Sequence, residues 1–104
     1  MLVIDQSQND GAVEVQAGDS FRIELSENPT TGYRWYLNPL VETSLRVVEN
    51  SFELAQGGYG AGGVRHWTLS ADRAGVVRIQ IERKRGRQAP PAEIFTVTID
   101  VKAC

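Results

Sequence analysis

The sequence has little of the chemistry on which enzymes and metal sites depend. Its 104 residues include one cysteine, Cys104 at the last position, and one histidine, His66. A single cysteine excludes an internal disulfide and a cysteine-based zinc site. Nucleophilic catalysis needs a nucleophile and a base that converge in one pocket, and the pattern offers no such set. We therefore expect a protein that is not an enzyme and that uses neither a metal nor another cofactor.

The sequence also lacks a long hydrophobic run and a strong net charge. No apolar stretch approaches the roughly 18 residues of a membrane span, and the first residues lack the charged and apolar regions of a signal peptide. The net charge is −2, whereas nucleic-acid modules usually carry a domain-wide positive balance. These absences predict a soluble chain that contacts neither membrane nor nucleic acid. It is expected in the cytoplasm, or in the periplasm or outside the cell if a leader has been removed.

The charges are unevenly placed along the chain. The first 60 residues hold three basic and nine acidic side chains, and the remaining residues hold eight basic and four acidic ones. Half of those eight basic side chains are Arg83, Lys84, Arg85 and Arg87. Such a cluster fits either a nucleic-acid patch or a solvated hairpin loop whose charges keep a strand edge from aggregating. The negative total favours the hairpin loop.

Alternation of apolar and polar residues at period two dominates the chain, and no stretch sustains the pattern of an amphipathic helix. We predict a single all-β domain over residues 1–104, an immunoglobulin-like Greek-key β-sandwich of about seven to eight strands. A closed barrel is the alternative, because alternation does not say which strands pair. The expected strands are residues 2–5, 13–16, 21–25, 33–37, 45–54, 64–70, 77–81 and 95–102.

The apolar positions of this alternation define the expected core. Both tryptophans are interpreted as core residues, and His66 as a surface or boundary side chain of its strand. The core candidates, with Leu54 as a further one, are Phe21, Ile23, Leu25, Trp35, Leu37, Val47, Phe52, Trp67, Leu69, Val77, Ile79, Ile81, Phe95, Val97, Ile99 and Val101.

Three segments break the alternation, namely residues 26–33, 56–63 and 84–92, and function is expected there. In the first segment Pro29 fixes φ, Asn28 can cap the turn and Gly32 permits a positive φ. These features predict a stiff loop that holds its two threonines outward. A stiff loop loses little entropy on docking and suits a wedge in another protein's cleft, although an ordinary strand connection fits the motif equally well.

The second segment is rich in glycine, and Tyr59 is its only large side chain. Glycines allow close backbone approach, so the segment is expected either to lie extended along a partner with Tyr59 as its anchor or to be a plain connector. In a Greek-key sandwich the first and third segments emerge at the same end. That end is the expected binding site.

Two motifs in this order resemble the chagasin-like inhibitors of papain-like cysteine proteases. They are Asn28-Pro29-Thr30-Thr31-Gly32-Tyr33-Arg34-Trp35 and Gly60-Ala61-Gly62-Gly63, and the resemblance spans nearly the whole chain. It implies an immunoglobulin-like sandwich whose three adjacent loops occupy the active-site cleft of a protease. The implied function is reversible, competitive inhibition by a monomer. An immunoglobulin-like binding module for another protein or a carbohydrate is the alternative.

The resemblance also implies roles for single residues. Asn28, Pro29, Thr30, Thr31 and Gly32 would cover the catalytic Cys–His centre, with Thr30 or Thr31 hydrogen-bonded to catalytic groups. Gly60, Ala61, Gly62 and Gly63 would lie along the non-primed subsites, and Tyr59 would enter the hydrophobic S2 pocket. The resemblance thus assigns the centre and the non-primed side of the cleft to these two motifs.

The third loop departs from the family pattern. The family motif there is Arg-Pro-Trp, and the matching positions hold Arg83, Lys84 and Arg85. The family's tryptophan packs against an aromatic platform on the primed side of the protease. A guanidinium also stacks on aromatic faces. Our hypothesis is that Arg85 or Arg87 replaces the tryptophan in part.

Overall fold

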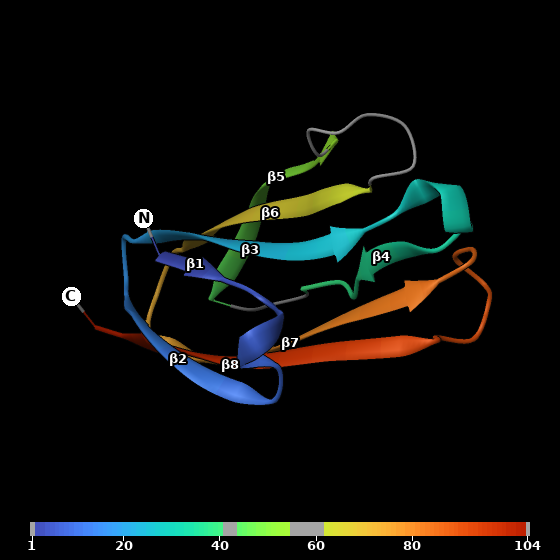
Figure 1. The fold of residues 1–104 in the computed structure, drawn as a ribbon. Helices are drawn as coiled ribbons and strands as arrows, with labels where there is room; N and C mark the ends of the chain where they lie inside the picture. The colour runs from blue at the N-terminus through green and yellow to red at the C-terminus, as the bar shows by residue number, and fades with distance from the viewer. Residues whose placement is uncertain (1, 41–43, 55–61, 104) are drawn as a thin grey trace.

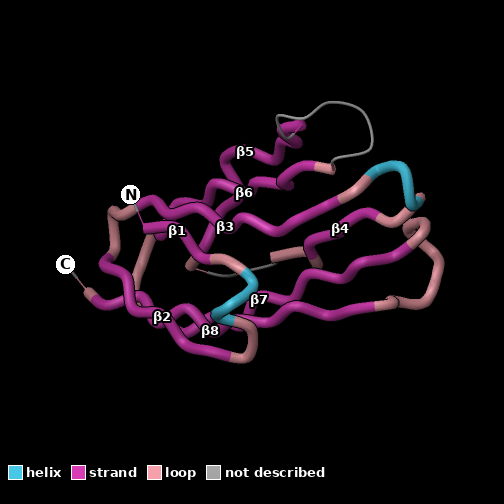
Figure 2. Tube along the Cα trace, viewed as in Figure 1, coloured by secondary structure: helices cyan, strands magenta, loops and turns pink. Residues whose placement is uncertain are grey.

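The computed structural model describes residues 2–40, 44–54 and 62–103, and it arranges them as two layers of strands (Figure 1). Two short 3-10 turns, η1 (Gln6–Gln8) and η2 (Pro29–Thr31), are the helical elements within these ranges (Figure 2). None of the described helices has the length and apolar character needed to cross a membrane. The strands are β1 (Leu2–Ile4), β2 (Gly11–Gln16), β3 (Ser20–Glu27), β4 (Arg34–Leu37), β5 (Leu45–Leu54), β6 (Gly63–Ala71), β7 (Gly75–Lys84) and β8 (Glu93–Lys102).

These eight strands form two four-stranded sheets, in the orders β1-β3-β6-β5 and β2-β8-β7-β4. Two pairs, β1 with β3 and β2 with β8, are parallel, and the other pairs are antiparallel. Apart from β2, the strand order is that of an immunoglobulin sandwich. The prediction of an all-β sandwich is confirmed, and the barrel alternative is wrong because the strands divide between two separate sheets.

The core lies between the two sheets and is built mainly from the inward side chains of β3, β6, β7 and β8. Leu37 and Phe52 are only half-buried. Val47 and Leu54 were expected in the core but are 38% and 55% exposed, because β5 is an edge strand and the strand at the matching edge of the other sheet, β4, is short. Four core residues not expected from the alternation are Ile4, Val15, Leu45 and Ala71.

A β-bulge lies in β5. The register shifts between Val47 and Glu49, which leaves Val48 as the extra residue, 56% exposed. The bulge bends the free edge of the sheet, which is one way in which proteins discourage pairing with another chain.

His66 in β6 is more buried than a surface position, at 9% exposure. Its ring nitrogens lie 3.2 Å from a carboxylate oxygen of Glu24 and 3.3 Å from a carboxylate oxygen of Glu53.

Strand register brings the non-alternating segments together at one end of the sandwich. Arg34, where β4 begins, pairs with Lys84, where β7 ends, so the connections at residues 28–33 and 85–92 leave the sheet side by side. Glu27 pairs with Gly63 in the other sheet, so the chain enters β6 next to the first connection. The expectation that the first and third loops emerge at the same end is confirmed (Figure 1).

Candidate functional site

The first loop is held together by hydrogen bonds to Asn28. The Asn28 side-chain oxygen accepts from the backbone N–H of Thr30 at 3.1 Å and from its hydroxyl at 2.7 Å. The Asn28 carbonyl accepts from the N–H of Thr31 at 3.1 Å and from its hydroxyl at 2.8 Å. The expected capping role of Asn28 is confirmed, and it closes the turn η2 that begins at Pro29.

Both threonines are exposed, as expected, and their hydroxyl protons are donated within the loop. A hydroxyl has one proton and two lone pairs. Thr31 also accepts the backbone N–H of Tyr33 at 3.3 Å through its Oγ1 atom. The outer surface of the loop therefore presents hydroxyl oxygens that can accept hydrogen bonds from a partner.

Gly32 closes the loop with a backbone angle that favours glycine. Its φ is +80°, and no atom lies within 4 Å of the place where a Cβ would stand. The position therefore disfavours other residues through backbone strain and not through crowding. The positive φ expected from the sequence is confirmed.

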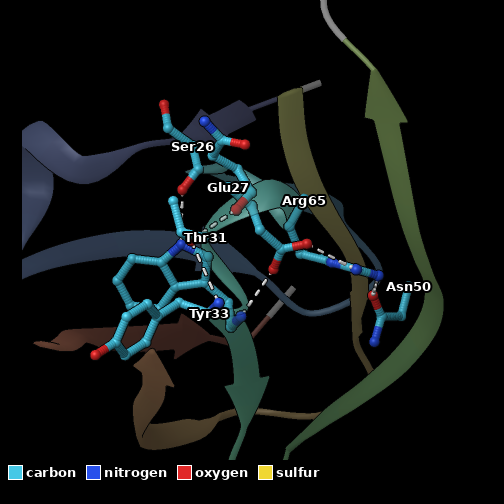
Figure 3. A network of polar contacts seen from close by, with 8 residues as sticks. Ser26, Glu27, Thr31, Tyr33, Asn50 and Arg65 are labelled. Carbon is cyan, nitrogen blue, oxygen red and sulfur yellow. Dashed lines mark hydrogen bonds and ion pairs between the residues drawn. The ribbon is translucent and has the colours of Figure 1, made fainter. Parts of the chain in front are cut away.

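Two hydrogen bonds tie the incoming and outgoing strands of the first loop. The Trp35 backbone N–H donates to Glu27 Oε1 at 2.8 Å, and its indole N–H donates to the Ser26 carbonyl at 2.8 Å. Figure 3 shows the Glu27 carboxylate between the first-loop stem and the guanidinium of Arg65. The base of the loop is therefore joined by side-chain hydrogen bonds between two strands that belong to different sheets.

Glu27 is a site residue that the sequence analysis missed. Its side chain is 2% exposed and forms an ion pair with Arg65 at 2.8 Å. Arg65 also donates to Asn50 at 3.3 Å, and its guanidinium lies 5.4 Å from the centre of the Phe52 ring. The signal for Glu27 was its place in the alternation, since it continues the inward positions of β3 with a carboxylate.

The described end of the second loop packs against the first loop. Gly62 has a φ of +76°, and a Cβ built there would lie 3.4 Å from the Asn28 Cβ and from the Glu27 carbonyl. A side chain at Gly63 would collide with the backbone of β5. The other predicted residues of this loop, Tyr59, Gly60 and Ala61, lie outside the described residues.

The third loop contacts the stem of the first through two arginines. The guanidinium carbons of Arg83 and Arg85 each lie 5.1 Å from the centre of the Tyr33 ring. Arg83 also pairs with Glu93 at 3.1 Å. Both arginines were expected at the site, but their contact with Tyr33 depends on the register of β4 and β7, which the sequence pattern leaves open.

Lys84 points to the other side of the hairpin. Its ammonium donates to the Arg87 carbonyl at 3.0 Å, pairs with Glu82 at 3.2 Å and lies 5.5 Å from the centre of the Tyr36 ring. Lys84 is therefore held both within its own hairpin and against β4. The expectation of a hairpin loop at the cluster is confirmed by the antiparallel pairing of β7 and β8.

A cavity of about 450 Å³ opens between the loops. In the described ranges, no group of three or more His, Cys, Asp or Glu residues is arranged to hold a metal. The loop end therefore places the first loop beside a hollow. The cavity is lined by Gln6, Ser26, Glu27, Asn28, Thr31, Tyr33, Trp35, Gly62, Gly63, Val64, Arg83 and Glu93.

Comparison with known proteins agrees with this arrangement. The family model described as Chagasin family peptidase inhibitor I42 matches residues 14–99. Chagasin from Trypanosoma cruzi is 27% identical over 105 residues, which cover 96% of this chain and 96% of that protein.

Two solved structures show the same fold. The cysteine protease inhibitor EhICP2 from Entamoeba histolytica superposes with a TM-score of 0.83 at 16% identity, over 97% of this chain and 94% of that one. PbICP-C, whose structure was solved in complex with falcipain-2, superposes with a TM-score of 0.59 at 16% identity, over 98% of this chain and 89% of that one.

Proposed function

The chain belongs to the chagasin family of peptidase inhibitors, and we propose that it inhibits papain-like, clan CA cysteine proteases reversibly and competitively. In this proposal residues 1–104 form one inhibitor domain, a monomer, that plugs the active-site cleft with three adjacent loops. Membership in an inhibitor family makes the chain an inhibitor and not an enzyme. The complex of PbICP-C with falcipain-2 is a precedent for a protease partner in this fold.

The observation that carries the proposal is the internal bonding of the first loop. Its hydrogen bonds to Asn28 exist before any partner arrives, so docking loses little conformational entropy. The Asn28 carbonyl oxygen accepts two hydrogen bonds from Thr31, so it would have to give these up to enter the oxyanion hole of a protease. We propose that the loop fills the cleft without being cut.

The threonine hydroxyls supply the contact with the catalytic centre in this proposal. The catalytic histidine of a cysteine protease, when it pairs with the thiolate, is an imidazolium and donates hydrogen bonds. The hydroxyl protons of Thr30 and Thr31 are donated within the loop, so both hydroxyls can only accept from a partner, and Thr31 has one lone pair left beside the Tyr33 N–H. The two residues thus match the polarity of the centre that they are proposed to cover.

The other two loops would extend the contact to either side. Gly60, Ala61, Gly62 and Gly63 are proposed to lie along the non-primed subsites with Tyr59 in the S2 pocket. The packing of Gly62 against Asn28 supports a second loop held next to the first.

The third loop is proposed to reach the primed side through its arginines. Arg83 and Arg85 both stack on Tyr33 at the loop end, and this supports a guanidinium poised near the cleft. Arg85 and Arg87 are both exposed to solvent. Either guanidinium is proposed to stack on an aromatic side chain of the protease.

The test is a titration of papain and of a cathepsin L-like protease with the purified chain, measured with a fluorogenic peptide substrate. Tight inhibition that competes with substrate, reverses on dilution and leaves the chain intact is the expected result. Thr31→Arg should weaken inhibition at least a hundredfold. The matched control is Val76→Arg, which places the same charge on a 70% exposed residue at the far end of β7.

The proposal makes two outcomes decisive. Inhibition lost in Thr31→Arg but kept in Val76→Arg supports docking through the loop end. No inhibition of either protease at micromolar concentration would overturn the proposal and favour the alternative, a binding module for another protein or a carbohydrate.

A further inference from the structure

We propose that Glu27 and Arg65 are a positioning pair that holds the first loop and the start of β6, beside Gly62 and Gly63, in one binding geometry before the protease arrives. This inference rests on the proposed function, because it assigns the pair a role in the inhibitory surface. Neither residue is expected to touch the protease, since Glu27 is 2% and Arg65 18% exposed at the side chain.

Glu27 joins the two strands of the first-loop stem. It is the last residue of β3, and its carboxylate accepts the Trp35 N–H of β4 at 2.8 Å. β4 is the edge strand of the other sheet, so this hydrogen bond links the two sheets directly beneath the loop. The indole of Trp35 reinforces the link through the Ser26 carbonyl. The loop therefore leaves and returns at a fixed spacing.

Arg65 carries this restraint to the second loop. It lies two residues after Gly63, where β6 begins, and pairs with Glu27 at 2.8 Å. Its guanidinium also donates to Asn50 and stacks on Phe52, both in β5. Figure 3 shows Arg65 between Glu27 and Asn50. Because β5 and β6 are the strands that flank the second loop, one ion pair connects the stems of both loops.

The chemistry of the pair favours positioning over stabilisation. Burial of a carboxylate and a guanidinium has a large desolvation cost, and well-packed apolar residues often fill such a site with equal or greater stability. Apolar contacts, however, do not fix the relative orientation of the groups that they join. Charge-assisted hydrogen bonds fix donor and acceptor in angle and distance. The Glu27 carboxylate uses one oxygen for each stem.

Loss of the pair should therefore lower the fraction of molecules in which the loops have the binding geometry. If the competent geometry is populated only a fraction of the time, the apparent affinity falls by that fraction. The fall appears in the association rate constant, because the bound complex keeps the same contacts. Loss of a direct contact instead appears mainly in the dissociation rate constant.

The experiment compares rate constants for inhibition of papain by the wild-type chain, three variants and one control variant. The paired apolar variant, Glu27→Leu with Arg65→Met, should lower the association rate constant about tenfold or more and leave the dissociation rate constant within about twofold. Tyr59→Ala, which removes the proposed contact with the S2 pocket, should mainly raise the dissociation rate constant. Glu27→Gln keeps an acceptor for the Trp35 N–H and should restore part of the association rate.

The matched control removes an exposed ion pair from the opposite end of the same sheet. Arg46 and Asp72 pair at 3.1 Å with side chains 64% and 45% exposed. The variant Arg46→Met with Asp72→Leu should leave both rate constants unchanged. Melting temperatures of all variants report whether a kinetic change follows from a general loss of stability.

A readout without a protease separates this inference from the proposed function. Hydrogen exchange followed by NMR should show faster exchange at the amides of Thr31, Tyr33 and Trp35 in the paired apolar variant, with core amides of β7 and β8 unchanged. If the wild-type chain does not inhibit papain, the proposed function fails while this measurement still reports on positioning. Wild-type exchange and wild-type association in the apolar variant, or faster exchange throughout the chain, would overturn the inference.

Discussion

Arg85 stacks on Tyr33, with its guanidinium carbon 5.1 Å from the centre of the ring. The contact joins the third loop to the stem of the first, and Arg83 lies at the same distance from the same ring. In the free protein the guanidinium that is proposed to meet an aromatic side chain of the protease already has an aromatic partner. Binding would then exchange or share a contact that already exists.

This relationship limits the contribution of the third loop to affinity. A cation–π contact contributes about 0.5–2 kcal/mol, depending on how far it is desolvated. We predict that Arg85→Ala with Arg87→Ala weakens inhibition of a papain-like protease about two- to thirtyfold and reduces the dependence of affinity on salt. The measurement is the inhibition constant at low and at high ionic strength.

Arg73→Ala is the control for that prediction, because Arg73 lies in the connection between β6 and β7 at the far end of the sandwich. It should change neither the affinity nor its salt dependence. If the double variant at Arg85 and Arg87 also leaves both quantities unchanged, the third loop does not contribute to binding through charge or stacking.

Three glycines near the site allow backbone strain to be separated from crowding. Gly63 has a crowded Cβ position with no positive φ, Gly32 has a positive φ in open space, and Gly86 has open space with no positive φ. We predict that alanine lowers the free energy of unfolding by about 3 kcal/mol at Gly63 and about 1 kcal/mol at Gly32. At Gly86 the change should stay within about 0.5 kcal/mol.

Urea denaturation of the three alanine variants checks this order, and inhibition assays add the functional consequence. Gly63→Ala should also weaken inhibition, because the added methyl group collides with the Glu53 carbonyl and displaces the start of β6 from β5 beside the second loop. Equal costs at Gly32 and Gly86 would show that the backbone angle at Gly32 does not constrain the loop.

The strands could be predicted because each has one face against the core and one against water. That regularity gives period-two alternation, and each of the expected strands is present with shifts at its ends. The core assignment was wrong at Val47 and Leu54 because alternation reports which face a residue occupies and not whether another layer covers it. Both residues belong to an edge strand.

The residues of the loop motifs could be named from the sequence, but their partners could not. Asn28 was expected to cap the turn because its side chain does so locally. The contacts of Tyr33 with Arg83 and Arg85, and of Glu27 with Arg65, join residues that are distant in sequence. Such contacts depend on strand register. Alternation does not determine the register, because a shift of two residues keeps every side chain on the same face of the sheet.

The cap at Asn28 leads to a prediction that separates stability from binding. Asn28→Ala removes the side-chain acceptor of the Thr30 N–H and hydroxyl and should lower the free energy of unfolding by about 1 kcal/mol. Asn28→Asp keeps an acceptor and should retain wild-type stability. It adds a negative charge beside the proposed position of the catalytic thiolate, so it should still weaken inhibition.

Chemical denaturation and inhibition constants of the two variants check this pair. Wild-type inhibition by Asn28→Asp would contradict a position of Asn28 close to the thiolate. A loss of stability in Asn28→Asp equal to that in Asn28→Ala would instead contradict the capping role.

Glu82 beside the third loop gives a prediction for acid pH. Hydrogen bonds from Gln80 and then from Lys84 hold the pKa of the Glu82 carboxyl below its ordinary value of 4.5. A carboxyl whose pKa is lower in the folded state stabilises the protein above the unfolded-state pKa, and the effect is lost as pH falls through the folded-state value. The stability difference between the wild type and Glu82→Gln should therefore be constant from pH 7 to about 5 and should shrink below that. Urea denaturation across this range measures the difference. A difference that stays constant down to pH 3 would show that the Gln80 and Lys84 contacts do not favour the ionised carboxylate.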